Sequence, residues 1–354
     1  MINRECGVFK TTYQADMALY TVPLARITVW AFLAFFVFVL PFVVDTQRLV
    51  WANLVGIHLI AALGLNILVG LCGQISVGHA AFMAVGGYTA AIMTSRADVP
   101  FWVGLVAGGV FASVYGLLVG LPSVRIKGFY LAFATLAAQF ITEWTITHVK
   151  WIGGGFQASI IVPRPSLGPL TIDTEREKYY LILALVIVAV VVALNIARSR
   201  LGRAFVAIRD RDVAAELIGV DIARYKLLAF MISSFYAGVA GALWVYYLGN
   251  ANIEAFRIVE SISFLAMIII GGLGSVLGTI YGTAFVVLLP FVLEEILQVF
   301  KGVIPVADIH SFVAYLRFAV YGGLIVFFLM VEPEGFNRLW RNVKDYFRVW
   351  PFPY

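Results

Sequence analysis

The chain has 354 residues, of which 62% are apolar and 13% are charged. Soluble domains are typically about half apolar and about one quarter charged, so this composition excludes both a soluble globular protein and a disordered one. The formal net charge of +5 does not indicate a nucleic-acid partner, because the cytoplasmic segments of membrane proteins carry such a basic excess.

Apolar runs long enough to cross a bilayer occur along the whole chain. A hydrocarbon core of about 30 Å needs about 20 apolar residues in a helix. Such runs cover Ile27–Val44, Leu49–Cys72, Ile75–Ser95, Phe101–Val124, Phe129–Val149, Tyr179–Ala197, Leu227–Ile253 and Phe312–Val331. The run Ser261–Leu293 is too long for one straight helix and contains Gly271, Gly272 and Gly274, which predicts two segments. We expect an all-α polytopic membrane protein with about ten membrane-embedded helices, including two glycine-broken segments.

The distribution of Lys and Arg predicts how the chain is oriented in the membrane. Basic residues gather in the segment Arg198–Lys226, after Pro122 and in the C-terminal tail. By the positive-inside rule these three regions are cytoplasmic, and the parity of the spans places the N-terminus inside as well. The first apolar run is expected to be a true span rather than a cleavable signal. Residues 1–354 are expected to form one transmembrane domain with a cytoplasmic loop at 198–226 and an extracytoplasmic loop at 150–178.

Motifs for nucleotide, metal and covalent chemistry are absent from the sequence. It has no G-x-x-x-x-G-K-[ST] loop for phosphates, no H-E-x-x-H pair for zinc and no G-x-S-x-G nucleophile. The cysteines, Cys6 and Cys72, lie far apart. We therefore expect no catalytic residue, no metal and no cofactor, and ATP hydrolysis would belong to a partner. Glu143 is the only acid expected inside a clear span, which argues against an ion-driven cycle.

A first glycine-rich stretch separates two apolar runs between Gly70 and Tyr88. Its glycine and polar residues are candidates for gating a translocation pathway: Gly73, Gln74, Ser76, Gly78 and His79. This composition predicts a helix break whose backbone groups must find partners in the protein or in a water-filled cavity. The alternative is a tight cytoplasmic turn that uses small residues for packing.

A second glycine cluster contains Gly271, Gly272 and Gly274, which are also pathway candidates. The apolar run before it, Ile262–Ile270, would cover only about 14 Å as a helix, roughly half a bilayer. A re-entrant or broken helix accounts for this length better than a full span does. The alternative is flexible helix packing.

The cytoplasmic segment Arg203–Asp221 interleaves acidic and basic residues around a small apolar face. Asp212 can cap a short helix over Val213–Ile218, and Gly219 suits the position after its end. Such a helix has too little surface to fold alone, so we expect it to dock onto a cytoplasmic protein. The alternative partner is membrane lipid, whose headgroups hold many basic loops. The candidate docking residues are Arg209, Asp210, Asp212, Glu216 and Gly219.

With these features the chain resembles the permease subunits of branched-chain amino acid ABC importers, of the LivM type. The resemblance covers about residues 50 to 330, and its motifs are Gly73–Tyr88, Arg209–Gly219 with Ala223–Phe230, Ala237–Ala242 and Gly271–Gly282. It implies that the segment Arg203–Asp221 holds a coupling helix that rests on an ATPase subunit. The partners it implies are a second related permease, two cytoplasmic ATPase subunits and an extracytoplasmic binding protein, assembled in the cell inner membrane.

The extracytoplasmic loop departs from the family pattern. After Trp151 the family usually has a Gly-Gly pair followed by Asp-Gly or Asn-Gly, whereas this chain continues with Gln157-Ala158. The residues expected at the substrate handover are Gly154, Gly155, Phe156 and Gln157. The resemblance implies import of branched-chain or other hydrophobic amino acids by alternating access. Urea, short amides and aromatic or aliphatic acids are the alternative substrates, and a stand-alone ion-coupled carrier or channel is the alternative from another class.

Overall fold

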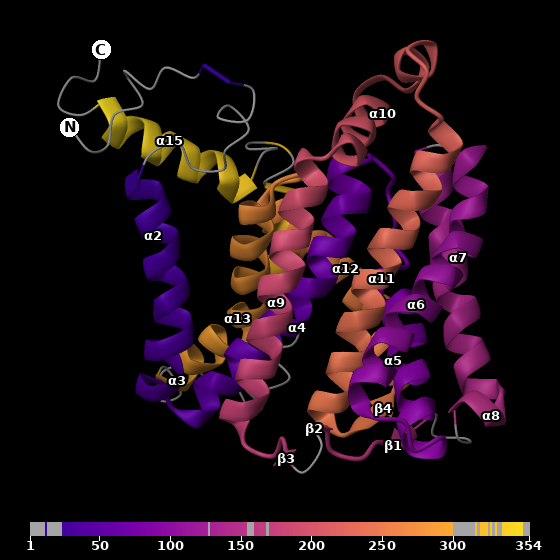
Figure 1. Ribbon diagram of the computed structural model, residues 1–354, viewed down its shortest axis with the longest axis vertical. Coiled ribbons are helices and arrows are strands. Elements are labelled where there is room, and N and C mark those ends of the chain that lie inside the picture. The colour runs from indigo at the N-terminus through magenta and orange to yellow at the C-terminus, as the bar shows by residue number, and fades with distance from the viewer. Residues whose placement is uncertain are drawn as a thin grey trace.

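The computed structural model describes residues 11–12, 23–126, 128–153, 159–167, 170–299, 316, 319–324, 326–327, 330 and 335–349. This part of the chain is a bundle of helices that run side by side (Figure 1). Five helical segments are long and apolar enough to cross a bilayer: Thr46–Leu71, Phe101–Val124, Glu175–Arg198, Ile222–Leu248 and Val276–Ile296. The prediction of an all-α polytopic membrane protein is confirmed. Half of the expected span Phe312–Val331 lies outside the described residues.

The helices follow the apolar runs because a backbone without access to water must satisfy its own hydrogen bonds. The first run forms α2 (Pro23–Ala34), the π-helical turn η1 (Phe35–Val39) and α3 (Leu40–Val43). The long segments are α4 (Thr46–Leu65) with the π-helical turn η2 (Asn66–Leu71), α6 (Phe101–Gly120) with η3 (Leu121–Val124), α9 (Glu175–Arg198), α11 (Ile222–Leu248) and α13 (Val276–Val299). The others are α5 (His79–Arg96), α7 (Phe129–His148), α8 (Lys150–Gly153), α10 (Arg200–Leu217), η4 (Ile253–Phe256), α12 (Ile258–Gly271) and α15 (Gly335–Val349).

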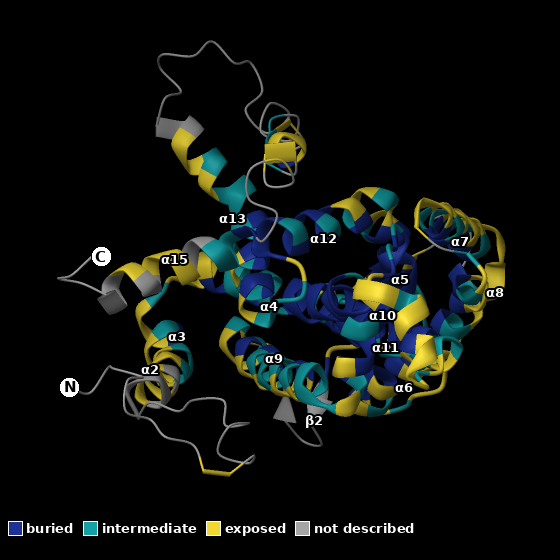
Figure 2. Cartoon of the chain, turned by 90° about the horizontal axis from the view of Figure 1, so that it is seen from above, coloured by how far each residue is buried: buried dark blue, intermediate teal, exposed yellow. Residues whose placement is uncertain are grey.

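Helices α4 and α11 form the centre of the bundle, where the buried residues gather in Figure 2. Helix α11 packs against α4, α5 and α6. The packing is close because small residues face each other: a Cβ atom on Gly238 of α11 would lie 2.6 Å from the Gly108 carbonyl oxygen of α6. Helices α9 and α13 leave most of their apolar surface uncovered, as expected of helices that face lipid.

The two ends of the bundle differ in structure (Figure 1). One end carries short antiparallel strands: β1 (Ser159–Ile161) pairs with β4 (Asn250–Asn252), and β2 (Ser166–Leu167) pairs with β3 (Leu170–Thr171). Helix α10 lies at the opposite end, together with α15, whose axis runs across the spans rather than along them (Figures 1 and 2).

Two expected element boundaries differ from the structure. The helix expected over Ile75–Ser95 begins only at His79, and the residues before it are non-helical. The segment 198–226 is almost wholly helical. Here the hydroxyl of Ser199 accepts hydrogen bonds from the next amides and so starts α10 directly after α9.

Candidate functional site

The first break, which we define as residues Gly70 to Gly78, is the connection from the end of η2 to the start of α5. Helix α4 widens into the π-helical turn η2 and ends, and Gly73 takes a positive φ of 71°. A non-helical stretch, in which Gln74 and Ser76 are buried, then leads to Gly78. The amide of Val77 donates to the Thr135 hydroxyl of α7 at 3.0 Å, so the non-helical backbone finds a partner inside the protein. The predicted helix break is confirmed.

The polar side chains of the first break are buried in this conformation. Gln74 is 8% exposed, and Ser76 and His79 are 0% exposed. The His79 Nε2 atom lies 2.9 Å from the Ala61 carbonyl oxygen of α4, which makes Nε2 the protonated nitrogen. The Nδ1 atom of His79 and the side-chain oxygens of Gln74 and Ser76 have no hydrogen-bond partner among the residues that the structure describes. These groups could meet a solute only in a conformation in which the first break opens.

The second break, which we define as residues Gly271 to Ser275, separates α12 from α13. Gly272 and Gly274 have φ values of 114° and 80°, which a residue with a side chain rarely adopts. Helix α12 has 14 residues and is therefore about 21 Å long, less than a bilayer core. The prediction of two segments broken at the glycines is confirmed.

The two breaks lie against each other, a contact that the sequence does not predict. Asn66 in η2 joins them: its Oδ1 atom accepts from the Gly274 amide at 2.8 Å, and its Nδ2 atom donates to the Ser275 carbonyl at 3.2 Å. Asn66 is 2% exposed, so both hydrogen bonds are shielded from water. We call this contact the break joint.

Helix α10 reaches the break joint through Arg209. The guanidinium Nη1 atom donates to the Gly70 carbonyl at 2.8 Å, and Nε donates to Asp210 at 3.0 Å. The structure thus brings together three of the predicted site residues, Gly73, Gly274 and Arg209.

The far half of α10 points away from the bundle and is bounded by a kink. Arg211 leaves the helical conformation, and the Asp212 carboxylate accepts from the next amide at 2.9 Å. The helix ends with Gly219 at a φ of 89°, as the sequence predicts. Beyond the kink, Leu217 and Ile218 are 84% and 78% exposed, so this half of α10 presents an apolar surface.

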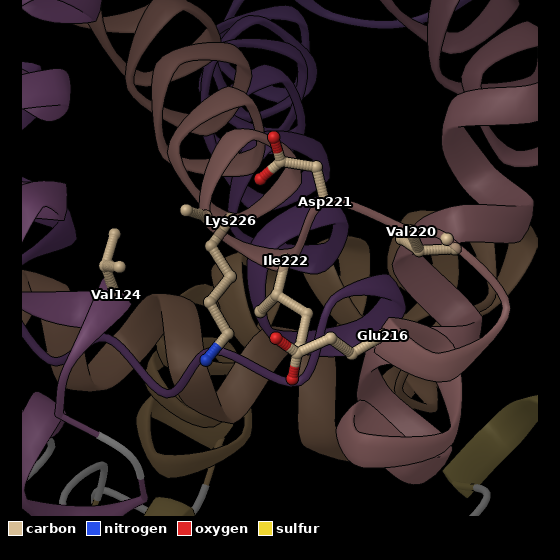
Figure 3. Close-up of a pocket in the computed structure, with 8 residues that line it drawn as sticks. Val124, Glu216, Val220, Asp221, Ile222 and Lys226 are labelled. Carbon is tan, nitrogen blue, oxygen red and sulfur yellow. The ribbon is translucent and has the colours of Figure 1, made fainter.

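A cavity of about 490 Å³ separates the end of α10 from the start of α11. The carboxylate of Glu216 and the side chain of Lys226 extend into this region from the two helices, with Val124 on the other side (Figure 3). The Lys226 ammonium lies 3.4 Å from the Ser123 carbonyl oxygen. The predicted docking residue Glu216 is therefore part of a recess next to the apolar surface of α10.

Helix α15 contacts the second break at its first residue. Gly335 has a φ of 60°, and a Cβ atom at this position would lie 2.7 Å from the Gly272 amide nitrogen. The Phe336 ring packs edge-on against Phe285 of α13, with 5.4 Å between ring centroids. Helix α15 thus packs against the second break and α13.

Glu260 precedes the apolar run Ser261–Leu293 and so falls outside the expected spans. It lies in the first turn of α12, and its Oε1 atom is 3.1 Å from Nε2 of His58 in the middle of α4. The expectation that Glu143 is the only acid inside a clear span stays a prediction, because Glu260 precedes the run Ser261–Leu293 and α12 is shorter than a bilayer core. The handover residues Gly154, Gly155, Phe156 and Gln157 lie outside the described residues.

Apolar spans, two breaks at membrane depth and a helical segment at one end define an integral membrane transport subunit. The family model described as "Branched-chain amino acid transport system / permease component" matches residues 47–329, and the chain belongs to this family. Members of the family are transport subunits, which agrees with the sequence-based expectation of a permease rather than an enzyme.

Known relatives are permease proteins. The chain is 31% identical to the high-affinity branched-chain amino acid transport system permease protein LivM of Escherichia coli over 318 residues, 83% of this chain and 71% of the relative. It is 27% identical over 253 residues to the probable ABC transporter permease protein y4mJ of Sinorhizobium fredii, with coverages of 68% and 73%. It is also 24% identical over 242 residues to the E. coli permease protein LivH, with coverages of 64% and 78%. No solved structure matches the chain significantly.

Proposed function

We propose that this chain is one of the two transmembrane subunits of an ATP-driven importer that moves branched-chain or other hydrophobic amino acids inward across the cell membrane. A second, related permease completes the pathway. The similarity of the chain to both LivM and LivH supports this arrangement, since both are named as permeases of a branched-chain amino acid transport system.

The observation that carries the proposal is the exposed apolar surface of α10. Leu217, Ile218 and Val213 are large apolar residues, each at least 65% exposed, at an end of the bundle rich in basic residues. Uncovered apolar groups of this kind mark protein contacts. Two ATPase subunits, one on each permease, would cover these surfaces. Both termini of the chain then lie on the same, cytoplasmic side.

In the proposed cycle, ATP binding draws the two ATPase subunits together and displaces α10. The displacement opens the break joint, and substrate passes the two breaks. A zwitterion can be held there by neutral polar groups and by the amino-terminal end of α5 at His79, because helix amino termini attract a carboxylate. An extracytoplasmic binding protein would deliver the substrate near residues 154–157.

The proposal is tested by purifying the chain with its partners through an affinity tag and reconstituting the complex in liposomes. We expect two ATPase subunits and a second permease to copurify, and ATP-dependent uptake of labelled leucine when binding protein is supplied. Labelled urea and a short amide serve as competing substrates in the same assay. Uptake of leucine by the purified chain alone, without ATP, would instead establish a stand-alone carrier or channel.

A further inference from the structure

Arg209 is placed where it touches both breaks at once. Its guanidinium donates to the Gly70 carbonyl of the first break at 2.8 Å. A Cβ atom on Gly274 of the second break would lie 3.3 Å from Arg209 Nη1 and 3.1 Å from the Gly70 carbonyl oxygen. The guanidinium therefore lies in van der Waals contact with one break while it is hydrogen-bonded to the other.

The Gly70 carbonyl depends on Arg209 for its hydrogen bond. Beyond η2, the amides of residues 72, 73 and 74 donate to the carbonyls of Ile67, Val69 and Leu68. None of these amides donates to Gly70, so the guanidinium satisfies a helix-terminal carbonyl that the π-helical turn leaves open.

The stem of Arg209 is fitted to the first break as closely as its head group. A Cβ atom on Gly73 would lie 2.8 Å from Arg209 Cγ, so only a residue without a side chain lets the stem lie there. The inner half of α10 that carries Arg209 is anchored to the bundle by Phe205 and Ile208, which are 0% and 4% exposed. The contact thus belongs to the packed part of α10, on the bundle side of the kink at Arg211.

The contact requires the planar, forked head group of arginine. Nε donates to the Asp210 carboxylate at 3.0 Å while Nη1 donates to the Gly70 carbonyl. Two N–H groups of one planar guanidinium therefore bind acceptors that lie in different directions. A lysine ammonium is a single point on a flexible stem and cannot reproduce both bonds in this geometry.

We propose that Arg209 is a positioning residue that holds the two breaks together and releases them when the outer half of α10 is displaced. The inference rests on the proposed function, because the displacing force comes from the ATPase partner. Arg209 contacts no substrate in this scheme. It links the docking surface beyond the kink to the break joint, so that the joint opens only when the partner moves α10.

The test compares Arg209→Gln and Arg209→Lys with the matched control Arg203→Gln. Arg203 lies on the same helix and also donates to a backbone carbonyl, that of Arg198 at 3.0 Å. Leucine uptake and ATP hydrolysis are measured in the same liposomes containing the complete complex. We expect leucine transported per ATP to fall about tenfold or more in Arg209→Gln and less in Arg209→Lys, and to change less than about twofold in Arg203→Gln.

Three results would overturn the inference. The first is an unchanged ratio of leucine to ATP in Arg209→Gln, and the second is an equal loss in Arg203→Gln. The third is loss of the ATPase subunits from the purified Arg209→Gln complex, which would make Arg209 a docking residue instead.

A second readout needs no transport and so separates this inference from the proposed function. Ser76→Cys, introduced with Cys6→Ala and Cys72→Ala, leaves a single thiol, in the buried first break. If the wild-type complex fails to import leucine, the proposed function fails. Faster labelling of this thiol in Arg209→Gln than in Arg203→Gln would still support the positioning role, and equal labelling would refute it.

Discussion

Replacement of Asn66 by alanine should weaken the break joint without affecting the rest of α4. The substitution removes the hydrogen bonds to the Gly274 amide and the Ser275 carbonyl. Hydrogen bonds between membrane helices contribute on average about 0.6 and at most about 1.7 kcal/mol each, so the loss amounts to about 1–3 kcal/mol. A change of this size shifts an opening equilibrium by about 5- to 150-fold towards the open form.

The assay is the labelling rate of a thiol introduced by Ser76→Cys in a background with Cys6→Ala and Cys72→Ala, because position 76 is fully buried when the joint is closed. Asn53→Ala is the matched control, since Asn53 is a buried asparagine of α4 that also makes two hydrogen bonds, both to Glu175. We expect faster labelling in Asn66→Ala and an unchanged rate in Asn53→Ala. Equal rates in the two variants would mean that the joint does not control access to the first break.

Three further substitutions test other contacts of the chain. Leu217→Ser should leave folding stability within about 0.5 kcal/mol, because the side chain is 84% exposed, yet reduce copurification of the ATPase subunits; undiminished copurification would count against the docking surface. Gly335→Ala should lower the unfolding temperature, since the position has positive φ and a Cβ atom would crowd the second break; an unchanged temperature would contradict the contact. Glu260→Gln should destabilise the chain by about 1–3 kcal/mol, and the effect should largely vanish in a variant that also lacks His58; full additivity would show that the two residues do not interact.

The positions of the breaks follow from the sequence, but their contact does not. Glycines between apolar runs and a run too short for a span are local signals, because each can be recognised within a short stretch of the sequence. The joining residue, Asn66, is one polar residue inside the run Leu49–Cys72, and its partner Gly274 lies 208 residues further along the chain. No periodicity or spacing relates two such positions, so only the folded chain reveals the pair.

The structure of the segment Arg203–Asp221 was also predicted only in part. Asp212 and Gly219 are residues that begin and end helices, and the structure places a helix end and a kink beside them. The inner half of α10 was missed because charged segments between spans are read as loops, although Ser199 is a signal for a helix start. The positive-inside rule predicts on which side of the membrane Arg209 lies, but it does not predict which groups the guanidinium contacts.

The geometry of α12 would let a small displacement at the second break have a larger effect deeper in the bundle. One end of this helix is fixed at the second break, and the other carries Glu260 beside His58. A tilt of about 10° around the break would move the far end of a helix about 21 Å long by about 4 Å. The carboxylate and imidazole now stand 3.1 Å apart, so such a tilt would separate them. In the proposed cycle, opening of the break joint would therefore also separate the polar pair at the opposite end of α12, and glycine at the pivot would permit the tilt without strain.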